Sequence, residues 1–276
     1  MLRSEETIGM SGASTEERRY ASRRPGRLNV TRVRQVHQIT PHMTRITFGG
    51  DDLSEFLSNG TDQHVALYFY DADVELPRPF TADAARALLP VARPRLRRYT
   101  IRQHHPERGE VDMDFVLHGA DQLASGWAET VRPGDESIWF GPSPAYPLDP
   151  EAPWYLFLGD ETALPAIAAT LAELPATARA RVLIEVADAA EEQPLPTAAD
   201  VDVDWLHRNG RPAGSLLHEA ALALALPPGA GRVWGAAERG VVKSLRGHYV
   251  RDRGLDRAHT HLTAYWTRGE TQDSEV

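Results

Sequence analysis

The hydrophobic pattern of this chain changes near residue 150, and that change constrains the fold more than any other feature. Before it, apolar side chains fall in short runs, and residues 111–117 begin with the strict alternation of a strand that buries one face. A proline-rich stretch follows over 142–153. Residues 154–158 are then apolar throughout, which is typical of a strand buried on both faces. The sequence therefore predicts two domains that are built in different ways.

The first half of the chain has the signals of a small antiparallel β-barrel. Its strand candidates are rich in β-branched and aromatic residues and lie at 30–38, 43–48, 65–70, 111–117 and 137–140. Turn residues such as Gly49-Gly50 and Pro133-Gly134 separate them. Because short strands at this spacing favour a barrel, we expect a disordered arm over 1–27 and an antiparallel β-barrel domain over 28–148.

The second half alternates strands with helices. Strands are predicted at 154–158, 181–187, 202–206, 232–236 and 260–267, and helices at 163–174, 215–226 and 238–251. Ser215 is a candidate N-cap of the second helix. This alternation predicts a parallel, doubly wound sheet. We therefore expect an α/β domain over 149–269 and a short tail over 270–276.

Composition removes several classes of function. The 276 residues contain no cysteine, which excludes disulfides, cysteine-bound iron–sulfur clusters and thiol chemistry. The formal net charge of −9 argues against a nucleic-acid partner. The chain shows no membrane span, signal peptide or heptad pattern, so we expect a cytoplasmic monomer. The eleven histidines lack the spacing of a ligand cluster, so no metal site is predicted.

The hexapeptide at 97–102, Arg-Arg-Tyr-Thr-Ile-Arg, is the strongest functional signal. Strand alternation would place Arg97 and Tyr99 on one face, with Thr100 and Arg102 on the other. A phenol ring can lie on a flavin while a guanidinium binds a phosphate in a bidentate manner. An edge strand with a solvated basic face fits the same residues, so the hexapeptide alone leaves both interpretations open.

Three further segments could carry ligands. The loop at 118–122 precedes a short helix, whose first N–H groups and Ser125 hydroxyl could bind a pyrophosphate. Residues 160–162 follow the first buried strand, at the position where open α/β sheets bind ligands, and Thr162 could cap the next helix. The aromatic pair at 265–266 could cover a flat ring. The competing interpretations are an ordinary turn, a plain helix cap and a core aromatic pair, respectively.

Together these segments resemble the siderophore-interacting protein family of flavin-dependent ferric-siderophore reductases, over about residues 29–269. The matching segments are R-R-Y-T-I-R at 97, V-D-M-D-F-V-L-H-G at 111, A-S-G-W-A at 124, L-G-D-E-T-A-L-P-A-I at 158, G-L-D-R at 254 and Y-W-T-R-G at 265. The resemblance implies a ferredoxin-reductase-like architecture with an FAD-binding barrel and an NAD(P)H-binding α/β domain. It also implies that hydride passes from NAD(P)H to FAD, and single electrons from FAD to a ferric siderophore.

The resemblance further implies roles for individual residues. Those expected to hold non-covalently bound FAD are Arg97, Tyr99, Thr100, Arg102, His118, Gly119, Ala124 and Ser125. Those expected to face the nicotinamide are Asp160, Glu161 and Thr162, with Trp266 beside the flavin. No catalytic acid–base group is implied, because the cofactor carries the chemistry.

The chain departs from the family at two positions that bear on the substrate. Relatives often carry a basic residue where Ala66 stands, and an arginine where Gly126 stands. Such charges would attract an anionic chelate, so the identity of the siderophore stays open. The candidate substitutes for chelate binding are Arg45, Arg78, Lys243 and Arg268.

The electron donor is the remaining question. The acidic stretch at 188–192 would repel the 2′-phosphate of NADPH, which favours NADH. Some relatives take electrons from a ferredoxin, which is therefore a further candidate partner. Two alternative functions also remain. One is a general NAD(P)H:flavin or ferredoxin-type reductase with a protein electron partner, and the other is a cofactor-free siderophore-binding protein.

Overall fold

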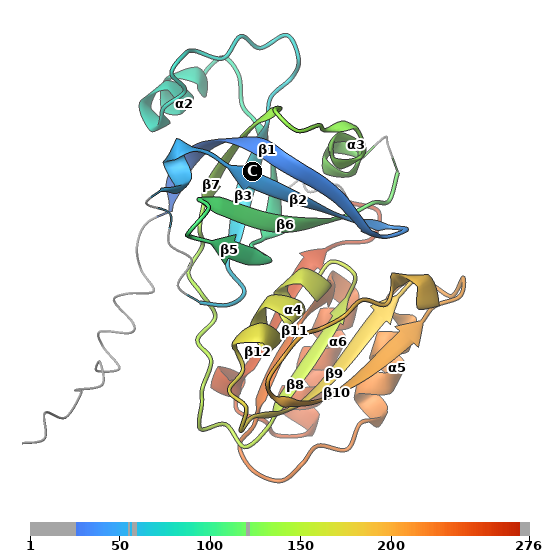
Figure 1. Ribbon diagram of the computed structural model, residues 1–276. Coiled ribbons are helices and arrows are strands. Elements are labelled where there is room, and N and C mark those ends of the chain that lie inside the picture. Colours follow the sequence, from blue (N-terminus) through green and yellow to red (C-terminus); the bar gives the residue numbers. More distant parts are fainter. Residues whose placement is uncertain (1–25, 55, 57–59, 120–121, 271–276) are drawn as a thin grey trace, which may run out of the picture.

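The computed structural model describes residues 26–54, 56, 60–119 and 122–270. They form a seven-stranded antiparallel sheet followed by a five-stranded parallel sheet, which lie one above the other in Figure 1. Both predicted kinds of sheet are confirmed. Residues 1–25 of the predicted arm and 271–276 of the predicted tail lie outside the described residues.

The antiparallel sheet curls into an open barrel, whose two edge strands are not paired with each other. Its strands are β1 (Arg27–Thr40), β2 (Met43–Gly49), β3 (His64–Phe69), β4 (Arg95–Thr100), β5 (Gln103–His105), β6 (Glu110–Val116) and β7 (Glu136–Gly141). Their order is β4-β3-β7-β1-β2-β6-β5, so the edge strands β4 and β5 are consecutive in the chain. Only Ile101 and Arg102 join them, and the Arg102 N–H donates to the carbonyl of Asp112 on β6 at 2.8 Å. This short link brings the two edges of the sheet together.

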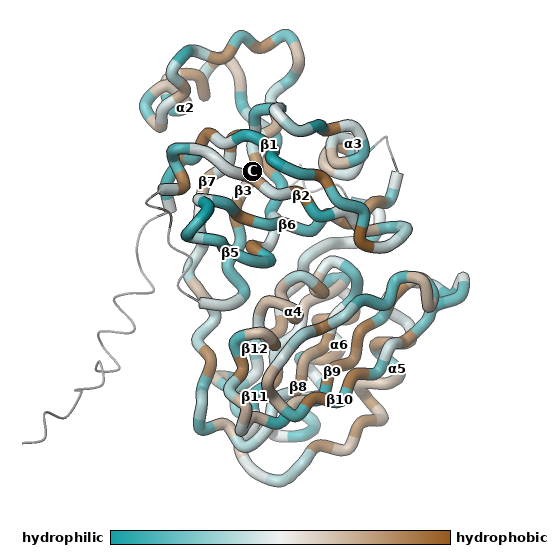
Figure 2. Tube along the Cα trace, viewed as in Figure 1, coloured by the Kyte–Doolittle hydropathy of each residue, from teal (hydrophilic) through white to brown (hydrophobic). Residues whose placement is uncertain are grey.

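Alternating apolar side chains fill the barrel. On β6, Val111, Met113 and Phe115 are fully buried, which confirms the face predicted from the alternating pattern. Trp139 of β7 is also fully buried, and its indole N–H donates to the Thr31 hydroxyl at 3.0 Å. The barrel therefore has a closed core of its own, and polar residues alternate with apolar ones along its strands (Figure 2).

The parallel sheet buries both of its faces. Its strands are β8 (Tyr155–Asp160), β9 (Arg179–Val186), β10 (Asp200–His207), β11 (Arg232–Glu238) and β12 (Thr260–Trp266), in the order β10-β9-β8-β11-β12. Tyr155 and Phe157 pack in one core with α4 (Leu164–Glu173). Leu156 and Leu158 pack in another core with α5 (Ser215–Ala223) and α6 (Arg239–Arg246). This arrangement explains why β8 is apolar throughout.

The remaining helices are short. Helix α3 (Leu123–Thr130) follows the loop after β6, and α2 (Ala82–Leu88) lies between β3 and β4, where it projects from the barrel in Figure 1. The hydrophobic pattern does not predict α2 because none of its residues is buried. Helix α6 ends in a π-helical turn over Gly247–Asp252, whereas an uninterrupted helix was expected there. The 3-10 turns are Asp51–Leu53, Ala189–Glu191 and Arg257–His259.

Phe115→Ala tests the barrel core. Phe115 is fully buried, so its truncation is expected to lower the free energy of unfolding by about 3–5 kcal/mol, through lost burial and a residual cavity. Urea unfolding followed by circular dichroism measures the loss. Phe140→Ala is the matched control, because Phe140 is 43% exposed. Equal losses in the two variants would contradict the assignment of Phe115 to the core.

Candidate functional site

The carboxyl ends of the parallel strands face the barrel (Figure 1). Two predicted ligand regions, the hexapeptide at 97–102 and residues 160–162, therefore lie toward the domain interface. One contact across the interface is made by Tyr265 of β12, whose hydroxyl donates to Oδ1 of Asp62 at 2.8 Å. Asp62 lies two residues before His64, which pairs with Thr100, the last residue of β4. Burial, reinforced by the Asp62 carboxylate, raises the pKa of Tyr265 well above its usual value. Tyr265 therefore links the segment beside the hexapeptide strand to the ligand edge of the parallel sheet.

Strand β4 presents Arg97 and Tyr99 on one face, as the alternation predicts. They pair in register with Leu67 and Val65 of β3, both of which are buried in the barrel. The ring of Tyr99 stacks on Phe115 with 4.1 Å between ring centroids, and burial raises the pKa of Tyr99 above its usual value. Tyr99 therefore offers a phenol ring that is held from beneath by the barrel core.

Arg102 lies just beyond the end of β4 and is a buried cation with incomplete partners. Its side chain is 9% exposed, and its Nε is 3.9 Å from Oδ2 of Asp114. Arg45 occupies both carboxylate oxygens of Asp114, at 2.6 and 2.8 Å. Nε of Arg102 is consequently buried without a hydrogen-bond partner among the described atoms. A buried guanidinium donor of this kind suits an anionic group such as a phosphate.

The loop between β6 and α3 is held by Ser125. The Ser125 hydroxyl is buried, accepts from the backbone N–H of His118 at 2.9 Å and donates to Glu129 at 3.4 Å. It thus ties the end of β6 to the helix. Gln122, which precedes α3, makes no capping hydrogen bond with its side chain. Gly119 has φ 119°, a backbone conformation that favours glycine. The start of α3 is therefore not filled by a capping side chain.

Asp160, at the end of β8, organises the edge of the parallel sheet. Its carboxylate accepts from the backbone N–H and hydroxyl of Thr162, at 2.9 and 2.6 Å, and from the indole N–H of Trp266 at 2.7 Å. Burial raises the pKa of Asp160 to about 6, although these hydrogen bonds oppose the rise. The expectation that Thr162 caps α4 is wrong, because α4 begins after Ala163 and has no side-chain cap.

Glu185 is an important residue of this edge that the sequence pattern does not reveal. It is fully buried at the end of β9 and accepts from the backbone N–H groups of Gly214 and Leu217 at 2.5 and 2.8 Å. The N-cap of α5 is Gly214, with φ 83°, so the prediction of Ser215 as the cap is wrong. Arg208 donates to both Glu185 and Glu161, which links two strand ends of the sheet.

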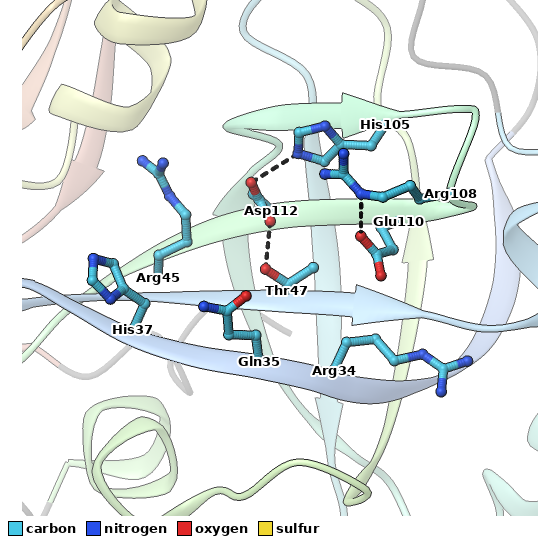
Figure 3. A pocket seen from close by; sticks show the side chains of 9 residues that line it. All are labelled: Arg34, Gln35, His37, Arg45, Thr47, His105, Arg108, Glu110 and Asp112. Carbon is cyan, nitrogen blue, oxygen red and sulfur yellow. Dashed lines mark hydrogen bonds and ion pairs between the residues drawn. The ribbon is translucent and has the colours of Figure 1, made fainter.

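The predicted chelate-binding cations are dispersed. Arg78 pairs with Glu136 at 2.5 Å, Arg268 donates to the carbonyl of Ala213 at 2.7 Å, and Lys243 is exposed on α6. Arg45 alone of the four lines a groove of about 390 Å³ on the outer face of the barrel (Figure 3). The groove is lined by Arg34, Gln35, His37, Arg45, Thr47, His105, Arg108, Glu110 and Asp112.

The acidic side chains of this groove are engaged with neighbouring groups of the groove. Asp112 accepts from the Thr47 hydroxyl at 2.6 Å and lies 3.0 Å from the His105 ring nitrogen, and Arg108 donates to Glu110 at 2.7 Å.

Across the described part of the chain, no three histidine or acidic side chains gather as metal ligands. No described helix is long and apolar enough to cross a membrane.

A curled barrel with this edge strand, joined to the ligand edge of a doubly wound sheet, defines a ferredoxin-reductase-like flavoprotein architecture. Residues 32–146 match the siderophore-interacting FAD-binding domain, and residues 152–269 match the siderophore-interacting protein family. The chain therefore belongs to the siderophore-interacting protein family.

Individual relatives agree with this assignment. An uncharacterized protein of Mycobacterium tuberculosis is 36% identical over 261 residues, which cover 89% of this chain and 92% of that protein. The ferric vibriobactin reductase ViuB of Vibrio cholerae is 27% identical, with 86% of this chain and 88% of that protein covered. The crystal structure of a siderophore utilization protein from T. fusca is similar with a TM-score of 0.78 and 33% identity, covering 90% and 96% of the two chains.

Asp160→Asn tests the buried carboxylate at the sheet edge. The pKa of Asp160 is raised in the folded protein, so the fold binds this proton more tightly than the unfolded chain does. The stability that Asp160 contributes is therefore present below about pH 4 and is lost as the pH rises through about 6. At 1.36 kcal/mol per pKa unit, wild type should lose up to ~3 kcal/mol relative to the variant over this interval.

Urea unfolding of both proteins at several pH values between 4 and 7.5 measures this difference. Asp200→Asn, at an exposed position on β10, is the control and should stay within about 0.5 kcal/mol of wild type. A stability difference between wild type and Asp160→Asn that does not change with pH would contradict the raised pKa.

Proposed function

We propose that this protein is a flavin-dependent reductase that transfers electrons from a reduced nicotinamide through FAD to a ferric siderophore. The observation that carries the proposal is the hydrogen bond from Tyr265 to Asp62. It joins the segment that leads into β3, the strand paired with the hexapeptide strand, to the carboxyl edge of the parallel sheet, where α/β folds bind nucleotides. Membership of the siderophore-interacting family, whose barrel is an FAD-binding domain, supports both the cofactor and the substrate class.

The residues of the barrel fit FAD. We propose that Tyr99, supported by Phe115, lies beside the flavin ring, and that Arg97 and Thr100 hold the ribityl side. The unsatisfied Nε of Arg102 and the uncapped start of α3 suit the pyrophosphate. The remaining proposed contacts lie in the loop after β6 and at the start of α3: His118, Gly119, Ala124 and Ser125.

When bound, FAD supplies the redox chemistry: two electrons enter with a hydride from the nicotinamide and leave one at a time to two ferric ions. The protein positions the reactants. We propose that Asp160, Glu161 and Thr162 face the nicotinamide, and that Asp160 orients Trp266 beside the flavin. Because the Asp160 carboxylate is fully buried and accepts three hydrogen bonds from the protein, we propose that its role is to hold these groups rather than to exchange protons with substrate.

The siderophore is the substrate, and we propose that cations attract it. Hard oxygen donors favour the ferric over the ferrous ion, so reduction weakens the complex and releases iron. The proposed cations are Arg45, Arg78, Lys243 and Arg268. Arg98 is a further candidate, because it is exposed on β4 and lies directly opposite Ala66, where relatives often carry a basic residue. A cytoplasmic monomer remains our proposal for the state of the protein.

Anaerobic absorbance spectroscopy tests the function. FAD-loaded protein should lose its flavin absorbance on addition of NADH or NADPH, and regain it when a ferric siderophore is added, while a ferrous-specific chelator reports iron(II). A spectrum that stays oxidised with both nicotinamides but is bleached by a reduced ferredoxin would replace the nicotinamide with a protein donor. Protein that cannot be loaded with FAD would overturn the reductase and favour a cofactor-free siderophore-binding protein.

Arg102→Ala tests the proposed FAD site. A hydrogen bond to a charged group contributes about 1.5–3 kcal/mol, so the Kd for FAD should rise roughly 10- to 100-fold. Titration of the FAD-free protein, followed by flavin fluorescence, measures the Kd. Arg108→Ala is the matched control, because Arg108 is exposed and pairs with Glu110 in the outer groove. Unchanged FAD affinity in Arg102→Ala would contradict the phosphate role.

A further inference from the structure

Asp62 reaches from the barrel into the parallel-sheet domain. Its Oδ1 accepts from the Tyr265 hydroxyl at 2.8 Å, and its Oδ2 accepts from the indole N–H of Trp234 at 3.0 Å. The two donors belong to the neighbouring strands β12 and β11. The Asp62 side chain is 13% exposed, and Nε2 of His261 lies 4.0 Å from its Oδ2. Burial lowers the pKa of His261, which favours its neutral form. One carboxylate therefore satisfies polar groups of two strands across the interface.

The segment that carries Asp62 is anchored on both sides. Thr61 forms a β-bridge with Tyr146, and the buried side chain of Gln63 donates to the carbonyl of Ser143 at 2.7 Å. Asp62 itself has φ 54°, which is uncommon for a residue other than glycine and better tolerated by aspartate and asparagine. A fixed segment in an unusual conformation thus directs this carboxylate at the other domain.

The hydrogen bonds of Asp62 continue into both halves of the proposed active site. On the barrel side, the carbonyl of Gln63, next to Asp62, accepts from the N–H of Ile101, directly after the end of the flavin strand, at 2.8 Å. The next residue, Trp266, donates to Asp160, at the proposed nicotinamide edge. A shift of Tyr265 would consequently move the flavin side and the nicotinamide side relative to each other.

We propose that Asp62 is a positioning residue for flavin reduction, which sets the orientation of β12 against the flavin strand. This inference rests on the proposed function. Asp62 acts through Tyr265 and Trp234, and without its carboxylate two largely buried donors would lose their acceptor. Since a misplacement of ~1 Å can slow an oriented reaction about 100-fold, loss of this contact should appear mainly in the rate of hydride transfer.

A second interface contact provides a matched control. Glu191 is buried and accepts from the Thr40 hydroxyl at 2.5 Å and from the backbone N–H and ring nitrogen of His42, at 3.1 and 2.7 Å. It also joins the two domains through a carboxylate, but its partners lie at the turn between β1 and β2. Neither Thr100 nor Tyr265 is among them. Because its carboxylate is buried against the barrel, Glu191 is also not one of the exposed acids, Asp188 and Glu192, of the stretch expected to repel a 2′-phosphate.

The test compares Asp62→Asn with Glu191→Gln in FAD-loaded full-length protein. Asparagine tolerates the backbone conformation, but its amide keeps only one acceptor oxygen and places an NH2 group against one of the two donors, Tyr265 or Trp234. Stopped-flow reduction at saturating NADH should slow by roughly 10- to 100-fold in Asp62→Asn. The KM for NADH and the Kd for FAD should change less than about threefold. Glu191→Gln should reduce the flavin within about twofold of the wild-type rate.

Hydrogen exchange of the FAD-free proteins adds a measurement that does not depend on activity. In Asp62→Asn, peptides that cover β12 should exchange at least about fivefold faster than in wild type, because their interface contact is lost. In Glu191→Gln the faster exchange should be confined to peptides around residues 38–46 and 188–193.

Several outcomes would decide against the inference. Wild-type rates in Asp62→Asn, or an equal loss in Glu191→Gln, would reduce Asp62 to a general interface contact. If Asp62→Asn does not fold, Tyr265→Phe removes only the hydroxyl and should slow reduction in the same direction, and a wild-type rate there overturns the proposal. If neither nicotinamide reduces the flavin bound to the wild-type protein, the proposed function itself is contradicted. Failure of the proposed function can thus be told apart from failure of the inference about Asp62.

Discussion

The hydroxyl of Tyr265 is the interaction on which the arrangement of this molecule depends. It donates to Asp62, so it joins the loop before β3, the strand that pairs with β4, to the end of β12. Each domain has an apolar core of its own, and Met43 of the barrel also packs into a core of the α/β domain. Apolar contacts are not directional, so they hold the domains together but set their angle less sharply than hydrogen bonds do. Directional hydrogen bonds between largely buried groups can fix it, because breaking one leaves a donor without an acceptor.

Buried carboxylates give the ligand edge of the parallel sheet its shape before any ligand arrives. Asp160 holds Thr162 and Trp266, and Glu185 holds the start of α5. Burying a carboxylate is costly unless its oxygens are satisfied, and both residues meet that need with N–H or O–H donors of the protein. The barrel shows the opposite case. There the buried Nε of Arg102 is a donor that has no acceptor among the described atoms. The barrel therefore fits an anionic cofactor.

The sequence predicted most strands to within a few residues, along with the positions of the hexapeptide and of residues 160–162. It failed where a residue acts through distant partners. Ser215 has the chemistry of an N-cap, yet Glu185, from a strand far back in the chain, caps that helix. The sequence of the apolar strand β9 contains no pattern that would identify Glu185 as the buried cap of a later helix. Helix α2 was missed for a related reason, since a helix that buries no side chain leaves no periodic pattern.

The sequence by itself determined the order and type of most elements, the two kinds of sheet and the strand that carries the hexapeptide, because apolar periodicity and motif spacing are local properties of the chain. Only the tertiary structure decided which polar groups meet. Tyr265 and Asp62 are 203 residues apart, and Trp266 and Asp160 are 106 apart. Such pairs depend on how barrel and sheet pack against each other, and that packing brings together side chains whose local sequence contains no sign of the partner.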